Sequence, residues 1–494
     1  AVYNAEMVGV LAPGGTVVNS YAEGVAALEA GDDIQYVGAN GAYDLNEYHN
    51  ITGVYGNYAW DPSAGGLVIE GVLSEAQLAE LKFGGDAAWE PAAPAAEDVT
   101  VGVFMAMTGP TDYEGIQAMN GCLPAVYRIN EAGGVLGSQV ECVEFDTRGT
   151  PTEAVPEMAR MLATASNLVG VVGPSSAEAA STAEGFADAD MVMCSVAGDA
   201  RFDKTTNPYY YRLVPSDAVS AKAMGLYSSE AGFENIALVF AAGASAQANV
   251  PPLLYAAESL GINVVENLTI EPEQPSYQTE IARLDQADPD AILWEMDEVT
   301  AGTFFGELVT AGMTDVPLLT TFIASFGWVQ EALVAAMGTE LLAEVLVPVF
   351  RYSTLDVGGY EFYDETFASL DSSHIAYEQY GPDHYTRAHY DCVTTMALAM
   401  VAAGSTDPAV YNAEMVGVLA PGGTVVNSYA EGVAALEAGD DIQYVGANGA
   451  YDLNEYHNIT GVYGNYAWDP SAGALVIEGV LSEAQLAELK FGGD

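Results

Sequence analysis

Between residues 98 and 215, short runs of mainly apolar residues alternate with longer segments in which apolar positions follow a helical spacing. The short runs predict buried strands and the longer segments predict helices. The strands we expect are Val99–Met105, Gln139–Phe145, Leu168–Val172 and Met191–Ser195. The helices we expect are roughly Ala118–Ala132, Glu153–Ala165 and Ala177–Ala187. Strands that alternate with helices are typical of a parallel sheet covered on both faces.

The same alternation returns further along the chain. The strands of this second series are expected at Ile236–Phe240, Ile262–Val265, Ala291–Trp294, Pro317–Thr320 and Val345–Phe350. Two series of this kind predict an α/β protein with two lobes. Open parallel sheets bind ligands beyond the carboxyl ends of their strands, so two facing lobes would hold a ligand in a cleft.

One segment of the chain occurs twice. Residues 1–86 recur as residues 409–494, and the only difference is Gly66 against Ala474. The period is far too long for a solenoid and indicates a repeated domain. We therefore interpret residues 87–494 as one unit and residues 1–86 as the tail of a preceding unit.

An Ala/Pro linker, residues 87–97, is expected between the tail and the unit that follows. We expect residues 1–86 to need a partner to complete a core, either an upstream unit or another molecule. The chain starts at Ala1 without Met or a signal peptide, which we interpret as a mature or excised piece.

Acidic residues outnumber basic ones along the whole chain, with 69 Asp and Glu against 12 Lys and Arg and a net charge of −57. The charge is evenly spread, so it belongs to the surface as a whole. High salt would screen it and low pH would neutralise it, and we expect a halophilic source first and an acidic habitat second. Nucleic acid is excluded as a partner, because few cations are available to neutralise phosphates.

Half of the residues are hydrophobic, which is typical of a folded chain, and no apolar run reaches the length of a membrane span. The cysteines lack the spacing of a metal site. We expect them to be buried apolar residues, with one disulfide possible if the protein is exported. They are Cys122, Cys142, Cys194 and Cys392. Sequons that permit glycosylation outside the cell start at Asn50, Asn267 and Asn458.

Six segments resemble, in the same order, the type I periplasmic solute-binding proteins of ABC transporters, in the branched-chain amino-acid (Leu/Ile/Val) group. They are VGVFMAMTGP from Val101, INEAGGVLG from Ile129, VGVVGPSSAEAASTAE from Val169, NPYYYRLVPSD from Asn207, ADPDAIL from Ala287 and DDIQYVGANGAYDLNE from Asp440, the last repeated from Asp32. The resemblance covers Asp98–Asp494. It implies an extracytoplasmic receptor without a cofactor that captures a small amino-acid-like ligand for an ABC permease.

The family's fold implies two lobes, each a mostly parallel sheet flanked by helices, and three interlobe crossings. These crossings are expected near Pro215, near Phe350 and near Asn458–Tyr463. The lobes that follow are residues 98–215 with 351–458 for lobe 1, and residues 216–350 with 459–494 for lobe 2.

A candidate anion site precedes the helix expected to start at Ala177. Exposed amides at a helix start, beside the hydroxyls of Ser175 and Ser176, suit a ligand carboxylate. The family uses this turn in that way, and Ser176 is the expected counterpart. A serine at this position could equally be an N-cap without any ligand.

The family's second ligand loop corresponds to Ala197-Gly198-Asp199. Asp199 stands where the family usually has Thr or Ser. Its carboxylate would repel a ligand carboxylate unless it were protonated or paired, for instance with Arg201.

In lobe 2 the family's tyrosine after the first strand corresponds to Ser245, and its ammonium-binding acid corresponds to Phe322. Asp297 or Glu298 could receive the ammonium instead. The pattern for an α-amino acid is therefore incomplete.

Tyr113 and Glu114, in the first loop of lobe 1, are expected at the same mouth. An aromatic residue there would either line the cleft or belong to a dedicated cage. His384 and His389 stand five positions apart and do not share a helix face, so we predict no metal site. Nothing in the sequence argues for catalysis, since it has no hydrolase elbow, P-loop or H-E-x-x-H motif.

Two functions are consistent with these observations. The first is capture of a small amino-acid-like solute in the interlobe cleft for ABC-type import. The second is a structural subunit of a tandem or head-to-tail extracellular filament or surface array, joined through residues 1–86.

Overall fold

The computed structural model forms two compact units, Ala1–Pro94 and Ala95–Asp494. The residues it describes are 15–30, 32–38, 41–42, 55–61, 66–73, 97–109, 111–352, 359–370, 380–381, 383–459, 461–482 and 485–486.

The first unit contains a small sheet and a hairpin. The sheet has the order β1-β2-β3, with β1 (Thr16–Val18) parallel to β2 (Ile34–Gly38) and α2 (Tyr21–Glu29) between them. Strand β3 (Gly41–Ala42) is antiparallel to β2, and the hairpin joins β4 (Tyr55–Asp61) to β5 (Gly66–Leu73).

A small local core is present in this first unit. Val18 and Ile34 are buried and lie beneath Gly24 of α2. Two buried side chains do not make a complete core, so the expectation that residues 1–86 need a partner to complete one stays a prediction.

In the second unit, lobe 1 is built on a five-stranded parallel sheet of order β10-β9-β8-β6-β7. Its strands are β6 (Val99–Met105), β7 (Val140–Asp146), β8 (Leu168–Val172), β9 (Met193–Ser195) and β10 (Tyr210–Arg212). Every residue of β6 is buried, because apolar clusters cover both faces of the sheet.

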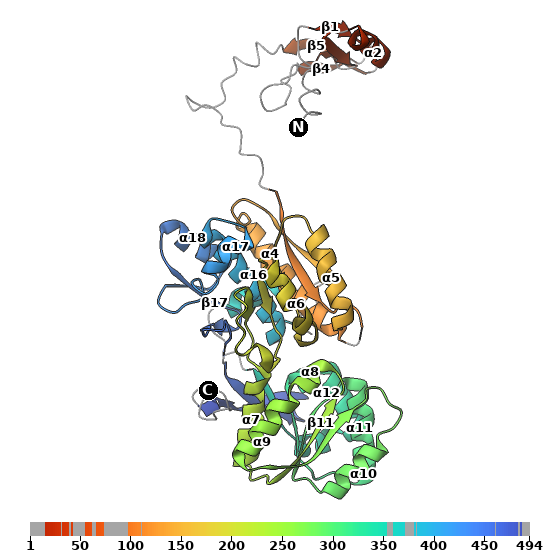
Figure 1. Ribbon diagram of the computed structural model, residues 1–494, viewed down its shortest axis with the longest axis vertical. Coiled ribbons are helices and arrows are strands. Elements are labelled where there is room, and N and C mark those ends of the chain that lie inside the picture. Colours follow the sequence, from red (N-terminus) through yellow and green to blue (C-terminus); the bar gives the residue numbers. More distant parts are fainter. Residues whose placement is uncertain are drawn as a thin grey trace. The chain divides into compact units, whose positions relative to one another are not determined.

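The helices of lobe 1 come from two distant parts of the sequence and pack together (Figure 1). They are α4 (Asp112–Glu131), α5 (Pro151–Thr164), α6 (Ser176–Asp188), α14 (Tyr360–Ser369), α16 (His384–Ala403), α17 (Pro408–Tyr411) and α18 (Tyr429–Ala438). A small sheet, β16 (Thr424–Val426), β17 (Ile442–Gly446) and β18 (Gly449–Ala450), accompanies them.

Lobe 2 is built on a seven-stranded sheet of order β12-β11-β13-β14-β15-β19-β20. Its strands are β11 (Asn235–Ala241), β12 (Asn263–Ile270), β13 (Ala291–Glu295), β14 (Leu318–Thr320), β15 (Leu346–Tyr352), β19 (Tyr463–Asp469) and β20 (Ala474–Leu481). The first five are parallel, and β19 and β20 add an antiparallel edge.

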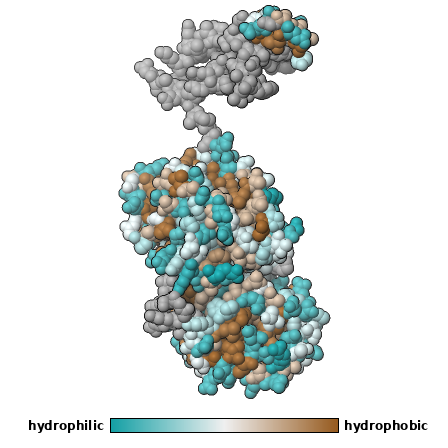
Figure 2. All heavy atoms as spheres, in the orientation of Figure 1, coloured by the Kyte–Doolittle hydropathy of each residue, from teal (hydrophilic) through white to brown (hydrophobic). Residues whose placement is uncertain are grey.

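Helices accompany the strands of lobe 2 in the alternation that the sequence predicts. They are α7 (Asp217–Glu230), α8 (Ala244–Ala248), α9 (Val250–Leu260), α10 (Gln278–Ala287), α11 (Glu298–Ala311), α12 (Gly327–Met337) and α13 (Thr339–Val345). One large apolar cluster forms the core of this lobe. Hydrophilic and hydrophobic residues are interspersed on the visible face of both lobes (Figure 2).

The predicted α/β class is confirmed, and every predicted strand is present with shifts of a few residues. The largest differences are that β12 extends to Ile270 and that α4 starts at Asp112 instead of near Ala118. Gly115 obscures this first turn in the sequence. The structure needs a glycine there, because a Cβ at Gly115 would lie 2.3 Å from the Ala106 carbonyl oxygen.

The chain passes three times between the two sheets: after β10, after β15 and before β19. Arg212 and Asn458, on the first and third passages, form an isolated parallel bridge. The passages therefore run side by side at this point, as in a hinge.

The cysteines form two disulfides, Cys122–Cys142 and Cys194–Cys392, so the expectation of at most one was wrong. Cys122–Cys142 joins α4 to β7 and Cys194–Cys392 joins β9 to α16. Sequence spacing could not show these pairs, because the fold brings Cys194 and Cys392 together across a separation of 198 residues.

Candidate functional site

A small cavity of about 30 Å³ lies between the two lobes. It has room for a water molecule and is too small for an amino acid. Six of the predicted site residues line it: Tyr113, Glu114, Ser175, Ser176, Ser245 and Phe322. Lobe 1 contributes the first four and lobe 2 the last two, so both lobes form the wall of this cleft.

The start of α6 is already engaged within the protein. Helix α6 begins at Ser176, one residue earlier than predicted, and Ser175 is the N-cap residue. The Ser175 hydroxyl donates to the Glu178 carboxylate at 2.9 Å, and Ser176 Oγ accepts a hydrogen bond from the Asp199 amide at 3.3 Å. Glu178 also accepts from the Thr147 hydroxyl at 2.6 Å.

Three predicted site residues do not line the cavity. Ala197 is buried, and its neighbours Val196 and Gly198 line the cavity instead. Asp199 forms the anticipated ion pair with Arg201 at 2.7 Å. Asp297 is the N-cap of α11 and accepts a hydrogen bond from the Thr300 amide at 2.9 Å, which accounts for its carboxylate without a ligand.

Three carboxyl groups gather at the cleft, and two of them were missed by the sequence analysis. They are Glu114 at the start of α4, Asp217 at the start of α7 and Glu295 at the end of β13. Glu114 and Asp217 line the cavity, and Glu295 lies behind Asn249, which donates to it at 3.2 Å. Glu295 also accepts from the Thr321 hydroxyl at 2.5 Å.

Burial and mutual repulsion favour the neutral form of these carboxyl groups. Burial, followed by the charge of Glu178, raises the pKa of Glu114 to about 8. Burial and the nearby Glu295 raise the pKa of Asp217 to about 8 against the opposing effect of Arg212. Burial raises the pKa of Glu295 to about 7. No lysine or arginine lines this cavity in the residues that the structure describes.

Aromatic rings close the cleft from both lobes. Phe322 of lobe 2 lies with its ring centre 4.7 Å from that of Tyr385 of lobe 1. Tyr113 of lobe 1 lies 5.5 Å from Phe326, which stacks on Trp328. The rings contact one another and form an apolar wall of the cleft. The dedicated aromatic cage therefore stays a hypothesis.

The missed residues had only weak signals in the sequence. Asp217 directly follows the predicted crossing at Pro215, and Glu295 directly follows a predicted strand, where ligands of open sheets bind. A search for acids at every strand end and crossing would have found both. Tyr385 comes from a distant part of the chain and only the tertiary fold brings it to the cleft.

The remaining candidates lie elsewhere. Asn458 is buried, and its amide nitrogen donates to the carbonyls of Phe202 and Asp203, which leaves no room for a glycan in the folded protein. Asn267 is exposed and remains a prediction, while Asn50 lies outside the described residues. His384 and His389 are buried in α16, and no metal-binding group of side chains occurs among the described residues.

The described helices include none that is long and apolar enough to cross a membrane. Two lobes on open sheets, joined by three passages of which the first and third run side by side, meet at a polar cleft and define a solute-binding class of protein.

Comparison with known proteins agrees with this class. A family model described as periplasmic binding protein matches residues 98–459, and the chain belongs to this family. The Leu/Ile/Val-binding protein BraC3 of Rhizobium johnstonii is 40% identical over 58 residues, which cover 12% of this chain and only 16% of that protein.

Solved structures of low sequence identity share the fold. The leucine-binding protein LivK of Thermotoga maritima has 16% identity and a TM-score of 0.61, covering 78% of this chain and 99% of that one. LivJ of Streptococcus pneumoniae, solved with isoleucine, has 19% identity and a TM-score of 0.59, covering 78% and 98%. A solute-binding protein of an ABC transporter from R. palustris, solved with benzoate, has 16% identity and a TM-score of 0.60, covering 78% of this chain and 96% of that one.

Proposed function

We propose that this protein is an extracytoplasmic receptor that captures a small amine-bearing, amino-acid-like solute in the interlobe cleft and delivers it to an ABC importer. The family membership of residues 98–459 supports the transport role and the extracytoplasmic location. The observation that carries the ligand class is the convergence of Glu114, Asp217 and Glu295 from both lobes at a cleft whose described lining lacks lysine and arginine.

An ammonium group that enters the cleft would supply the positive charge that the described lining of the cleft lacks. Burial and acidic neighbours disfavour the charged form of each carboxyl group. A bound cation would stabilise that charged form and lower the free energy of the site. A ligand carboxylate, where present, would face the start of α6 at Ser175 and Ser176.

The cavity of about 30 Å³ requires the lobes to separate before a ligand enters. The adjacent first and third passages provide the hinge for this motion. A ligand that contacts Glu114 of lobe 1 and Asp217 of lobe 2 at once binds the closed arrangement better than the open one, and this difference drives closure.

Calorimetric titration of the full chain with amino acids, simple primary amines and short carboxylates lacking an amine tests the proposal. We expect heat of binding from amine-bearing ligands only. Glu295→Gln should weaken binding at least tenfold, while Glu331→Gln, an exposed acid of the same lobe, should leave it unchanged. The absence of a heat of binding for every amine, or tight binding of amine-free carboxylates alone, would refute the proposed ligand class.

Binding should depend on pH with a defined sign. Below pH 8 the raised pKa values of Glu114 and Asp217 keep these groups protonated, so a cation must displace a proton. We expect affinity for a primary amine to rise between pH 6 and 8, by up to about tenfold per pH unit for one released proton, and then to level off. Affinity that is flat over this range contradicts the role of these carboxyl groups.

The structural role in a filament or array is not proposed here. Its motivations are the repeat, the departures from the family pattern in lobe 2 and the acidic surface, whereas the relatives named above are binding proteins.

A further inference from the structure

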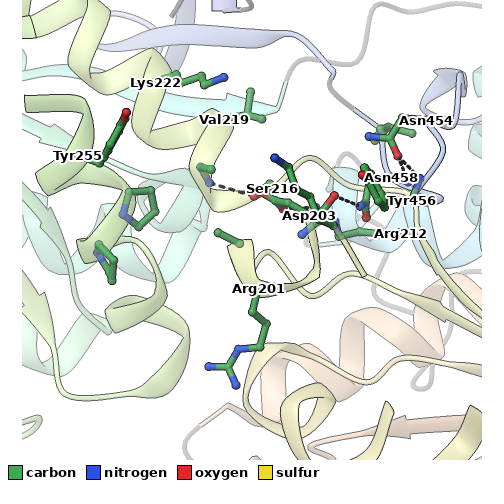
Figure 3. Close-up of a pocket in the computed structure, with 16 residues that line it drawn as sticks. Arg201, Asp203, Arg212, Ser216, Val219, Lys222, Tyr255, Asn454, Tyr456 and Asn458 are labelled. Carbon is green, nitrogen blue, oxygen red and sulfur yellow. Dashed lines mark hydrogen bonds and ion pairs between the residues drawn. The ribbon is translucent and has the colours of Figure 1, made fainter. Parts of the chain in front are cut away.

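A second and larger pocket of about 590 Å³ lies beside the hinge and shares no lining residue with the cleft. We call it the hinge pocket. Lobe 1 contributes the loop after β9 and the end of β10, lobe 2 contributes α7 and α9, and the third passage contributes residues 454–459. Figure 3 shows Lys222 and Tyr255 on the helices of lobe 2, and Asp203, Arg212 and Asn458 on the other side.

The charge of the hinge pocket is opposite to that of the molecule. The chain has only 12 lysines and arginines against 69 acids. Four of these basic residues line this one pocket: Arg201, Lys204, Arg212 and Lys222. Among the residues that the structure describes, Asp203 is the single acid in its lining. A random distribution of so few cations would not place a third of them together.

Two of these basic residues form ion pairs with acids of lobe 1. Arg201 pairs with Asp199, which lies outside the lining, at 2.7 Å. Arg212 pairs with Asp203 at 2.6 Å and also donates to the carbonyls of Ala197, Gly198 and Asp199. The lining still carries four cationic groups against one carboxylate, an arrangement that attracts anions.

One deeply buried donor of the lining lacks a partner among the residues that the structure describes. Arg212 is 1% exposed, and its Nε has no hydrogen-bond acceptor. A buried guanidinium nitrogen left without an acceptor is costly, and an oxyanion would supply that acceptor.

We propose that the hinge pocket binds a small oxyanion with at least two negative charges, of the phosphate or polycarboxylate type. Arg212 would be its buried anchor, and Lys204 and Lys222 would hold it from the two lobes. Because the pocket is formed by both lobes and by two of the three passages, a bound anion connects lobe 1 to lobe 2 beside the hinge. Anion binding and cleft binding are then reciprocally coupled.

The test is calorimetric titration of the full chain with inorganic phosphate and with citrate, at constant ionic strength set by sodium chloride. We expect saturable one-site binding of at least one of them, and the tighter one identifies the phosphate or the carboxylate chemistry. The double variant Lys204→Gln/Lys222→Gln should lose at least tenfold in affinity. The control variant Arg283→Gln removes one exposed cation of lobe 2 that does not line the hinge pocket, and it should leave the affinity unchanged.

Thermal unfolding provides a second readout that does not depend on a cleft ligand. A specific anion should raise the unfolding midpoint of the wild type and of Arg283→Gln, and raise it less in the lysine double variant. Absence of binding by both anions, or equal affinity in the double variant, overturns the proposal. These two measurements use no amine. A negative result would therefore contradict the anion site without contradicting the proposed cleft function.

Discussion

The two copies of the repeated segment have the same local structure and different surroundings. Helices α2 and α18 start in the same way, with Ser20 at φ −143° and ψ 160° and Ser428 at φ −142° and ψ 161°. Strand pairing also matches, since Thr16 faces Ile34 and Thr424 faces Ile442. Tyr21, however, is 87% exposed, whereas its copy Tyr429 is 2% exposed.

The difference comes from what each copy packs against. In lobe 1, the Tyr429 hydroxyl donates to the Gly134 carbonyl at 3.0 Å, and the Tyr444 and Tyr451 hydroxyls donate to the buried Asp391 carboxylate at 2.8 and 2.6 Å. Hairpin β19–β20 extends the sheet of lobe 2, whereas β4–β5 forms a sheet of two strands. One sequence thus yields one local fold and two degrees of stabilisation.

The largest expected effect comes from deleting one copy at a time. A chain of residues 87–494 should unfold with the same midpoint as the full chain, because lobe 1 and lobe 2 keep all their elements. A chain of residues 87–408 should show no cooperative transition, since the core of lobe 1 loses buried residues such as Tyr429 and Tyr444. Circular dichroism during urea titration measures both.

A chain of residues 1–408 sharpens the same experiment, because it retains only the N-terminal copy. A restored transition would show that the copies are interchangeable and differ only in context. A chain 87–408 that unfolds like the full chain would contradict the assigned role of the C-terminal copy.

Substitution of the paired tyrosines comes next in size. Tyr429→Ala should lower the free energy of unfolding of the second unit by about 3–4 kcal/mol, from the lost packing and the lost hydrogen bond to Gly134. Tyr21→Ala, the matched control, should change stability by less than about 0.5 kcal/mol because this side chain is exposed. Equal losses in denaturant titrations would show that Tyr21 is also packed in solution.

The paired glycines should respond with opposite signs. A Cβ at Gly432 would lie 2.4 Å from Leu398 Cδ2, so Gly432→Ala should destabilise the second unit by about 1–2 kcal/mol. A Cβ at Gly24 would meet only Ile34 and Val18, at 3.5 and 3.7 Å. Gly24→Ala should therefore stabilise α2 by about 0.5–1 kcal/mol, seen as slower amide exchange in that helix. Changes of the same sign in both copies would contradict the difference in packing.

The smallest expected effect is one that the copies share. The side chains of Ser20 and Ser428 each accept a hydrogen bond at 3.3 Å, from the amides of Glu23 and Glu431. Ser20→Ala and Ser428→Ala should each cost their own helix about 1 kcal/mol, measured by amide exchange in the first turn. Unequal losses of helix stability would show that tertiary packing also affects the contribution of the N-cap.

The same division between local and tertiary information holds at the candidate site. Ser175 and Ser176 were predictable because a strand followed by a helix start is a local pattern, and the resemblance placed Ser245. Asp297 follows a strand in a similar way, yet it caps α11, because an acid before a helix serves the backbone as readily as a ligand. Tyr385 became visible only when the lobes were brought together.

The sequence by itself determined the strands, the helices, the N-caps of the repeated helices and the two-lobed α/β class, because these depend on neighbouring residues and on periodic burial. Two copies that differ at a single position and have the same β1–β2 and β16–β17 registers show this directly. The tertiary structure alone decided that Tyr429 is buried while Tyr21 is exposed, which cysteines pair, and that carboxyl groups meet in the cleft while cations meet at the hinge. Burial, disulfide pairing and electrostatic environment are set by residues that are distant in sequence. A local sequence pattern therefore does not determine these properties.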